Sequence, residues 1–180
     1  MSNHKPIRRI GIVGTGVIGA SWAALFLAKG LDVVATDPAP NAETRLREFV
    51  ASAWPALTRL GLSSGASQSN LKFTADVADA LASADFVQEN GPERVDFKQK
   101  LYGQLDELLP PDVIIASSSS GIPMSQIQPG ARAYPERCVI GHPFNPPHLI
   151  PLVEIVNCTG CSGGYRPRLK GGDAASVRRR

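Results

Sequence analysis

The 180-residue sequence is poor in cysteine and in aromatic residues, and it has no long apolar run. Three cysteines do not make the even framework of a disulfide-stabilised secreted domain, which favours a reducing, cytoplasmic compartment. No apolar stretch approaches the ~20 residues of a membrane-spanning helix, and the polar residues 1–9 are not a secretory signal. We therefore expect neither a disulfide scaffold nor a membrane protein.

The basic excess is confined to the end of the chain. The formal net charge is +3, but residues 157–180 hold six basic residues and one acid, which leaves −2 for residues 1–156. The basic residues are not interleaved with aromatic ones, so nucleic-acid binding is not expected. Residues 157–180 also contain five glycines and few apolar residues. We predict a disordered basic tail there, after a single domain at 1–156.

Strand patterns and helix patterns alternate along residues 1–156. Apolar runs predict strands at 7–13, 33–36, 71–74, 85–88, 113–116, 138–141 and 152–156. Helical patterns lie between them at 17–29, 41–54, 76–82, 92–109 and 124–128, with Pro55 ending or kinking the second helix and Pro92 in the first turn of the fourth. This alternation predicts an α/β fold with a doubly wound, mostly parallel sheet of the Rossmann type.

A glycine pattern, G-x-G-x-x-G, joins the first strand to the first helix at Gly14, Gly16 and Gly19. Such glycines permit the tight turn, the close approach of a pyrophosphate and close helix packing, while the N–H groups at the helix start, at Val17 and Ile18, face the phosphates. The second strand ends at Asp37, where a carboxylate accepts hydrogen bonds from ribose hydroxyls and repels a 2′-phosphate. The pattern predicts a dinucleotide site that takes NAD rather than NADP.

Three polar clusters follow strands of the predicted sheet, at residues 89–93, 117–120 and 142–145. Because ligands bind beyond the carboxyl ends of parallel strands, we expect these clusters and the glycine loop to line one cleft. The four serines at 117–120 are either a flexible loop or donors to a ribose, a nicotinamide or a substrate oxygen. No G-x-S-x-G elbow is present, so a serine nucleophile is not expected.

His142 is the candidate general base, because histidine titrates near neutral pH. If the proline-rich segment after it turns back, the carboxylate of Glu154 reaches the imidazole and fixes its tautomer. The alternative is a structural histidine at a strand end beside a solvated glutamate. His4 and His148 are expected in exposed loops. The C-x-x-C pair Cys158 and Cys161 has no further ligands nearby, so no metal site is expected.

The motifs taken together resemble the 3-hydroxyacyl-CoA dehydrogenase family. The order and spacing agree over residues 7–156, and the segments that carry the resemblance are 14–23, Glu89 with 92–94, 117–121, 141–147 and 151–154. The segment around Trp22 and the Pro-Glu-Arg run at 92–94 are most similar to the branch that holds carnitine 3-dehydrogenase and lambda-crystallin.

The resemblance implies NAD-dependent oxidation of a 3-hydroxyl to a 3-keto group, on a small 3-hydroxy acid or an acyl-CoA. His142 matches the family's base, Glu154 its carboxylate partner, and Ser120 the serine that touches both cofactor and substrate. Positions that line the nicotinamide side are matched by Glu93, Lys98 and Asn145, and the ribose-binding acid is matched by Asp37. The helical region after Asp37 shows no counterpart of the family's CoA-contacting residues, so the resemblance favours a 3-hydroxy acid over a CoA thioester.

One departure from the family is large. Family members continue past the position of Glu154 into a helical domain that closes the cleft and forms a homodimer, whereas here the sequence becomes rich in glycine and arginine. The departure fits a truncated or frame-shifted gene product, and it also fits a natural short form. Two functions follow: an enzyme of this family, or a catalytically impaired NAD-binding remnant or crystallin-like structural protein.

Overall fold

The computed structural model describes residues 6–150 and 152–157 of the chain. Their sheet has seven strands in the order β3-β2-β1-β4-β5-β6-β7, with parallel pairing throughout except for the antiparallel pair of β6 and β7. The strands are β1 (Arg9–Val13), β2 (Asp32–Thr36), β3 (Leu71–Phe73), β4 (Phe86–Glu89), β5 (Ile114–Ser117), β6 (Cys138–Pro143) and β7 (Val153–Asn157). The predicted α/β Rossmann-type sheet is confirmed.

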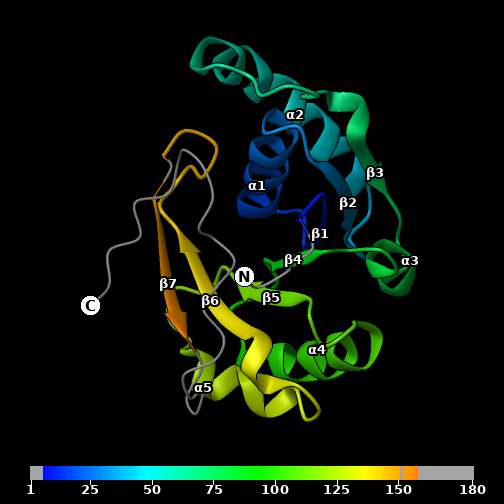
Figure 1. Ribbon diagram of the computed structural model, residues 1–180, viewed down its shortest axis with the longest axis vertical. Helices are drawn as coiled ribbons and strands as arrows, with labels where there is room; N and C mark the ends of the chain where they lie inside the picture. Colours follow the sequence, from blue (N-terminus) through cyan, green and yellow to red (C-terminus); the bar gives the residue numbers. More distant parts are fainter. Residues whose placement is uncertain (1–5, 151, 158–180) are drawn as a thin grey trace.

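Helices cover both faces of the sheet (Figure 1). They are α1 (Val17–Ala28), α2 (Ala42–Leu60), α3 (Val77–Leu81), α4 (Val95–Leu108) and α5 (Met124–Ile127), with short 3-10 turns η1 (Gln68–Asn70), η2 (Gln128–Gly130) and η3 (Pro135–Arg137). Alternation along β1 divides the core, because Ile10 and Ile12 pack with α1 and α2 while Val13 packs with α3, α4 and α5. Two hydrophobic layers therefore enclose the sheet.

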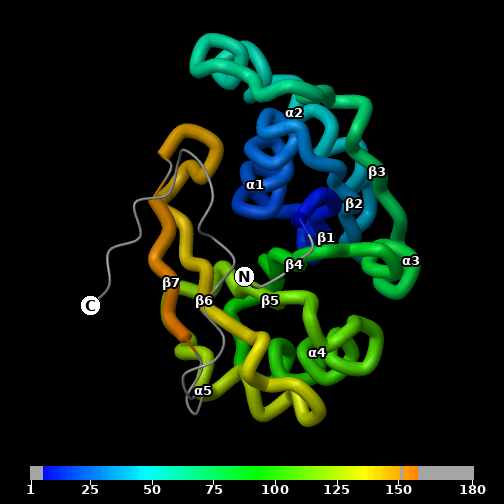
Figure 2. Tube along the Cα trace, viewed as in Figure 1, coloured from blue at the N-terminus to red at the C-terminus, as the bar shows by residue number. Residues whose placement is uncertain are grey.

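The chain reverses its direction of travel across the sheet between β1 and β4. From β1 it moves outward through β2 to β3, then returns to place β4 on the other side of β1 and continues to β7 (Figure 2). In sheets of this type the ligand crevice lies at such a switch point, beyond the carboxyl ends of the two strands, which are β1 and β4 here. The glycine loop and the polar cluster at 89–93 both lie at this point.

The structure decides one helix boundary that the sequence left open and corrects another. Helix α2 does not end at Pro55 but continues through it to Leu60, because Leu57 beyond the proline is buried on the same face as Ala53. Helix α4 begins at Val95 and not near Pro92, since Arg94 has extended backbone angles and caps the helix from outside. The residues from Pro92 to Arg94 are therefore loop, which places them beside the crevice.

Strand β7 extends through Asn157, one residue past the predicted end of the domain. The rest of the predicted basic tail, residues 158–180, lies outside the described residues, as does His4. Within the described ranges, no helix has the length and apolar character needed to cross a membrane.

A buried ion pair ties the end of α4 to the segment before β6. The guanidinium of Arg137 is fully buried and donates from Nη2 to the Asp106 carboxylate at 2.8 Å. It also donates to the backbone carbonyls of Asp106, Leu109 and Pro110. The same carboxylate accepts the N–H groups of Ala133 and Tyr134. The two charged side chains thus form hydrogen bonds with backbone groups at the end of α4 and in the segment before β6.

Replacing Asp106 by alanine is expected to lower the free energy of unfolding by ~3–5 kcal/mol, because it leaves the Arg137 charge buried without a counter-ion. Urea titration followed by circular dichroism measures the change. The matched control is Glu43→Ala, which breaks the exposed pair with Arg47 and should cost less than about 1 kcal/mol. Equal losses in the two variants would contradict the structural role given to the buried pair.

Candidate active site

The glycine loop has the geometry of a dinucleotide turn. Gly14 has φ +85°, and a Cβ there would meet the backbone carbonyl of Asn90 at 2.9 Å. A Cβ at Gly19 would overlap the carbonyl oxygen of Gly14, so only glycine allows α1 to sit this close to β1. A Cβ at Gly16, by contrast, meets no protein atom within 4 Å. Glycine at this position therefore avoids no clash with the protein itself. It leaves open the space outside the loop.

The start of α1 is free to bind an anion. Helix α1 begins at Val17 after Gly16, and no side chain caps its first N–H groups. These groups and the helix dipole attract negative charge. The cleared space at Gly16 and the uncapped N–H groups of Val17 and Ile18 together fit the pyrophosphate of NAD.

Asp37 follows β2 and is tied to the glycine loop. Its Oδ2 accepts the N–H of Thr15 at 2.7 Å and the Thr15 hydroxyl at 3.0 Å, and its Oδ1 accepts the N–H of Ala39 at 2.9 Å. Partial burial opposes ionisation, but these hydrogen bonds outweigh it and lower the pKa of Asp37. The carboxylate is therefore charged at neutral pH, and Oδ1 keeps capacity for a ribose hydroxyl. Nothing in the sequence pattern singled out Thr15.

Glu93 shapes the serine turn. Its Oε1 accepts the Ser119 hydroxyl at 2.7 Å and the N–H groups of Ser120 at 3.1 Å, Gly121 at 2.8 Å and Ile122 at 3.3 Å. Burial works against its charged form, yet the bonds from Ser119 and the backbone, with the charge of Lys98, lower the pKa of Glu93. Glu93 thus holds Ser120 at the crevice, a contact that spacing along the chain does not reveal.

Lys98 lies beneath the site and not on its surface. Only 1% of its side chain is exposed, and its ammonium lies 2.8 and 2.9 Å from the two oxygens of the buried Glu89 carboxylate. The same carboxylate accepts the Ser117 hydroxyl at 2.6 Å and the N–H of Gly91 at 2.6 Å. In this structure Lys98 therefore joins α4 to the ends of β4 and β5, and its contact with a nicotinamide stays a prediction.

A second polar network joins the serine run to the glycine loop. The Ser118 hydroxyl accepts hydrogen bonds from the Trp22 indole at 3.1 Å and the Gln88 amide at 2.8 Å, and it donates to Asn90 at 2.7 Å. Asn90 in turn donates to the carbonyl of Gly14 at 3.4 Å. Asn90 belongs to the predicted polar cluster at 89–93, but the sequence pattern carries no signal for this contact with Gly14.

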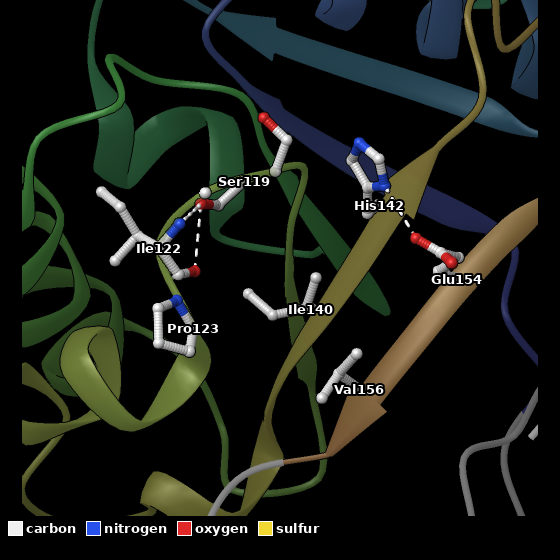
Figure 3. A pocket seen from close by; sticks show the side chains of 9 residues that line it. Ser119, Ile122, Pro123, Ile140, His142, Glu154 and Val156 are labelled. Atoms are coloured by element: carbon white, nitrogen blue, oxygen red, sulfur yellow. Dashed lines mark hydrogen bonds and ion pairs between the residues drawn. The ribbon is translucent and has the colours of Figure 1, made fainter. Parts of the chain in front are cut away.

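His142 and Glu154 face each other across the antiparallel pair of β6 and β7. They are register partners, and the His142 Nδ1 lies 3.2 Å from the Glu154 Oε2 (Figure 3). The side chain of His142 is 29% exposed and that of Glu154 is 62% exposed. The proline-rich segment does turn back, so the predicted contact between imidazole and carboxylate is present. Because Nδ1 faces Glu154, the other ring nitrogen, Nε2, is left for a different hydrogen-bond partner.

A shallow hollow of about 220 Å³ brings the predicted catalytic residues together. His142, Glu154 and Ser120 line it, and the register pair Ile140 and Val156 forms the next step along β6 and β7 (Figure 3). The remaining lining residues are Ser119, Gly121, Ile122 and Pro123. The lining of the hollow therefore combines polar groups with apolar side chains.

One residue differs from the sequence-based picture of the hairpin loop. Asn145 is exposed on this loop, outside the residues that line the hollow, and its contact with a nicotinamide stays a prediction. His148, expected in an exposed loop, is half-buried and hydrogen-bonded to Ser21 of α1. Within residues 6–150 and 152–157 no group of three or more His, Cys, Asp or Glu side chains could hold a metal ion. Cys158 and Cys161 lie outside these ranges.

Curated relatives with strong similarity share one name. The chain is 55% identical over 156 residues to an L-carnitine dehydrogenase of Streptomyces coelicolor and 53% identical over 150 residues to one of Pseudomonas putida. These alignments cover 87% and 83% of this chain but 49% and 46% of the relatives. The chain therefore spans about half the length of the curated relatives it matches.

Solved dehydrogenases share the fold. One is 5-formyl-3-hydroxy-2-methylpyridine 4-carboxylic acid 5-dehydrogenase, an NAD+-dependent dismutase, with 41% identity and a TM-score of 0.76 over 83% of this chain and 48% of that one. Another is the 3-hydroxybutyryl-CoA dehydrogenase of Escherichia coli K12, with 30% identity and a TM-score of 0.75 over 84% of this chain and 32% of that one.

The family model described as "3-hydroxyacyl-CoA dehydrogenase, NAD binding domain" matches residues 9–163, which is most of the chain. This match includes the glycine loop, Asp37, the serine turn and the facing pair of His142 and Glu154. The chain belongs to the 3-hydroxyacyl-CoA dehydrogenase family, within which it is an NAD-binding domain.

Proposed function

We propose that this chain supplies the cofactor site and the catalytic base of an NAD-dependent dehydrogenase that oxidises the 3-hydroxyl of L-carnitine, or of a similar small 3-hydroxy acid, to a ketone. The observation that carries the proposal is the His142–Glu154 pair in a hollow beside Ser120, at the sheet edge where the glycine loop lies. The names of the curated relatives support the choice of substrate.

The base is argued from the orientation of the imidazole. Glu154 accepts a hydrogen bond from Nδ1 of His142. The neutral ring therefore presents a lone pair at Nε2. That nitrogen takes the proton of the substrate hydroxyl, and the carboxylate stabilises the imidazolium that forms. Ser120, whose N–H is held by Glu93, offers its hydroxyl to the substrate oxygen.

NAD+, when bound, accepts the hydride from the carbon that bears the hydroxyl. The chain's own groups place the two reactants. Gly16 and the start of α1 hold the pyrophosphate, Asp37 holds the adenosine ribose, and His142 orients the alcohol. The proton stays on the imidazole of His142 until solvent removes it through the exposed side of the hollow.

The charge of the hollow favours a substrate that bears a cationic group. Glu154 lines it and Glu93 borders it through Gly121, while none of the nine lining residues is a lysine or an arginine. L-carnitine carries a quaternary ammonium group, which a carboxylate attracts and which apolar side chains accommodate through its methyl groups.

His142→Gln is expected to reduce NAD+-dependent turnover of L-carnitine by about 10²–10⁴-fold, because it removes the base. Glu154→Gln should have a smaller effect, since the amide still contacts Nδ1 but cannot stabilise the imidazolium. NADH formation followed by absorbance measures both, with 3-hydroxybutyrate and 3-hydroxybutyryl-CoA as competing substrates.

Glu43→Gln, on the exposed face of α2, serves as the control for loss of a surface carboxylate. Undiminished turnover in His142→Gln would overturn the assignment of the base. Preference for the CoA thioester would overturn the choice of substrate. NADH binding without turnover of any substrate would support the non-catalytic alternative.

Asp37→Asn is expected to weaken NADH binding about tenfold or more, because hydrogen bonds to a charged acceptor are lost. The pKa of Asp37 is lowered, so its charge is lost only as pH falls below the usual value of ~3.9, and the difference from wild type should stay constant between about pH 5 and 8. Calorimetric titration at several pH values measures it.

Asp32→Asn is the control, because Asp32 is exposed at the opposite end of the same strand. A difference between Asp37→Asn and wild type that grows or vanishes within this pH range would contradict the lowered pKa. Equal NADH affinity of Asp37→Asn and Asp32→Asn would contradict the ribose assignment.

A further inference from the structure

The loop between β6 and β7 is fastened to α1 by one serine. Ser21 is fully buried, and its Oγ lies 2.6 Å from the Nδ1 of His148 and accepts the backbone N–H of His148 at 3.1 Å. The ring of Phe49, from α2, packs edge-on against the imidazole with 5.6 Å between ring centroids. Burial lowers the pKa of His148, which favours the neutral ring that this arrangement needs.

Other hydrogen bonds of the loop are internal to the hairpin. Phe144 donates to the carbonyl of Leu152, and Leu149 and Ile150 donate to that of Pro146. Among the described residues, the hydrogen bonds that join residues 144–150 to α1 are the two between His148 and Ser21. The hairpin loop, drawn in orange, approaches α1 in Figure 2.

The two elements joined in this way carry different halves of the site. Helix α1 begins at the glycine loop, which anchors the pyrophosphate, and Ser21 lies two residues after Gly19. The hairpin carries His142 on β6 and Asn145 on its loop. Hydride transfer needs reacting atoms about 3–3.5 Å apart, so the separation of the two elements matters for chemistry more than for phosphate binding.

We propose that Ser21 and His148 are positioning residues whose hydrogen bonds set the hairpin of His142 against the glycine-loop helix, so that the nicotinamide end of the dinucleotide is held in register with the base. The inference rests on the proposed NAD-dependent function. The adenosine and pyrophosphate end needs only the glycine loop and Asp37. The nicotinamide end needs the hairpin as well, and only its binding depends on the Ser21–His148 contact.

The test compares NADH with ADP-ribose, which lacks the nicotinamide, by calorimetric titration of the full 180-residue chain. His148→Leu removes the side-chain hydrogen bond, whereas His148→Asn has nearly the same size as leucine and keeps a polar atom near the place of Nδ1. We expect His148→Leu and Ser21→Ala to weaken NADH binding about five- to tenfold, the value of one hydrogen bond, and to leave ADP-ribose binding within about twofold. His148→Asn should restore most of the NADH affinity.

Ser52→Ala is the control for loss of a helix serine, because Ser52 bonds only to a carbonyl of its own helix and is exposed. Amide hydrogen exchange reports on folding: it should rise in residues 144–152 and stay unchanged in β1 and β2. Equal weakening of both ligands, or no weakening in His148→Leu, would overturn the positioning role. If the wild-type chain binds neither ligand, the proposed NAD-dependent function fails, and the positioning role fails with it.

Discussion

The buried ion pair between Lys98 and Glu89 is the contact on which the rest of the site depends. One carboxylate at the end of β4 binds the ammonium from α4, the Ser117 hydroxyl from β5 and the N–H of Gly91. Buried charges of this kind are stable only when both partners and their hydrogen bonds are present. The pair therefore requires β4, β5 and α4 to meet in one arrangement. This arrangement also fixes where the loops that follow these elements begin.

Three carboxylates outside this pair, those of Glu93, Asp37 and Glu154, are more exposed to solvent and have different hydrogen-bond partners. Glu93 is close enough to the surface to remain charged, yet its Oε1 gathers the backbone of the serine turn, so it orders Ser120. Asp37 does the same for the glycine loop through Thr15. Glu154 is more exposed and has the imidazole of His142 as its partner. A charged acceptor that is half-solvated can order a loop without the desolvation cost of full burial.

The antiparallel return of β7 distinguishes this sheet from a wholly parallel one, and the contact between His142 and Glu154 depends on it. A parallel connection after β6 would need a crossover helix, which would carry Glu154 away from His142. The hairpin instead places the two residues in register, and its loop reaches back to Ser21. The same short segment thus carries His142, its partner Glu154 and a link to the helix of the glycine loop.

Local patterns in the sequence determined the alternation of strands and helices, the glycine turn and the acid at Asp37, because each depends on residues close together in the chain. They also predicted that polar strand ends meet at one edge, since parallel strands end on the same side of a sheet. The burial of Lys98, the capping of the serine turn by Glu93 and the attachment of His148 to Ser21 could not be predicted. Each joins residues well apart in the sequence or depends on which rotamer the packing allows, and no periodicity records such contacts. The sequence by itself determined which groups the site contains, and the tertiary structure alone decided which of them face the crevice and which hold it in place, because burial and hydrogen-bond partners exist only after the chain has folded.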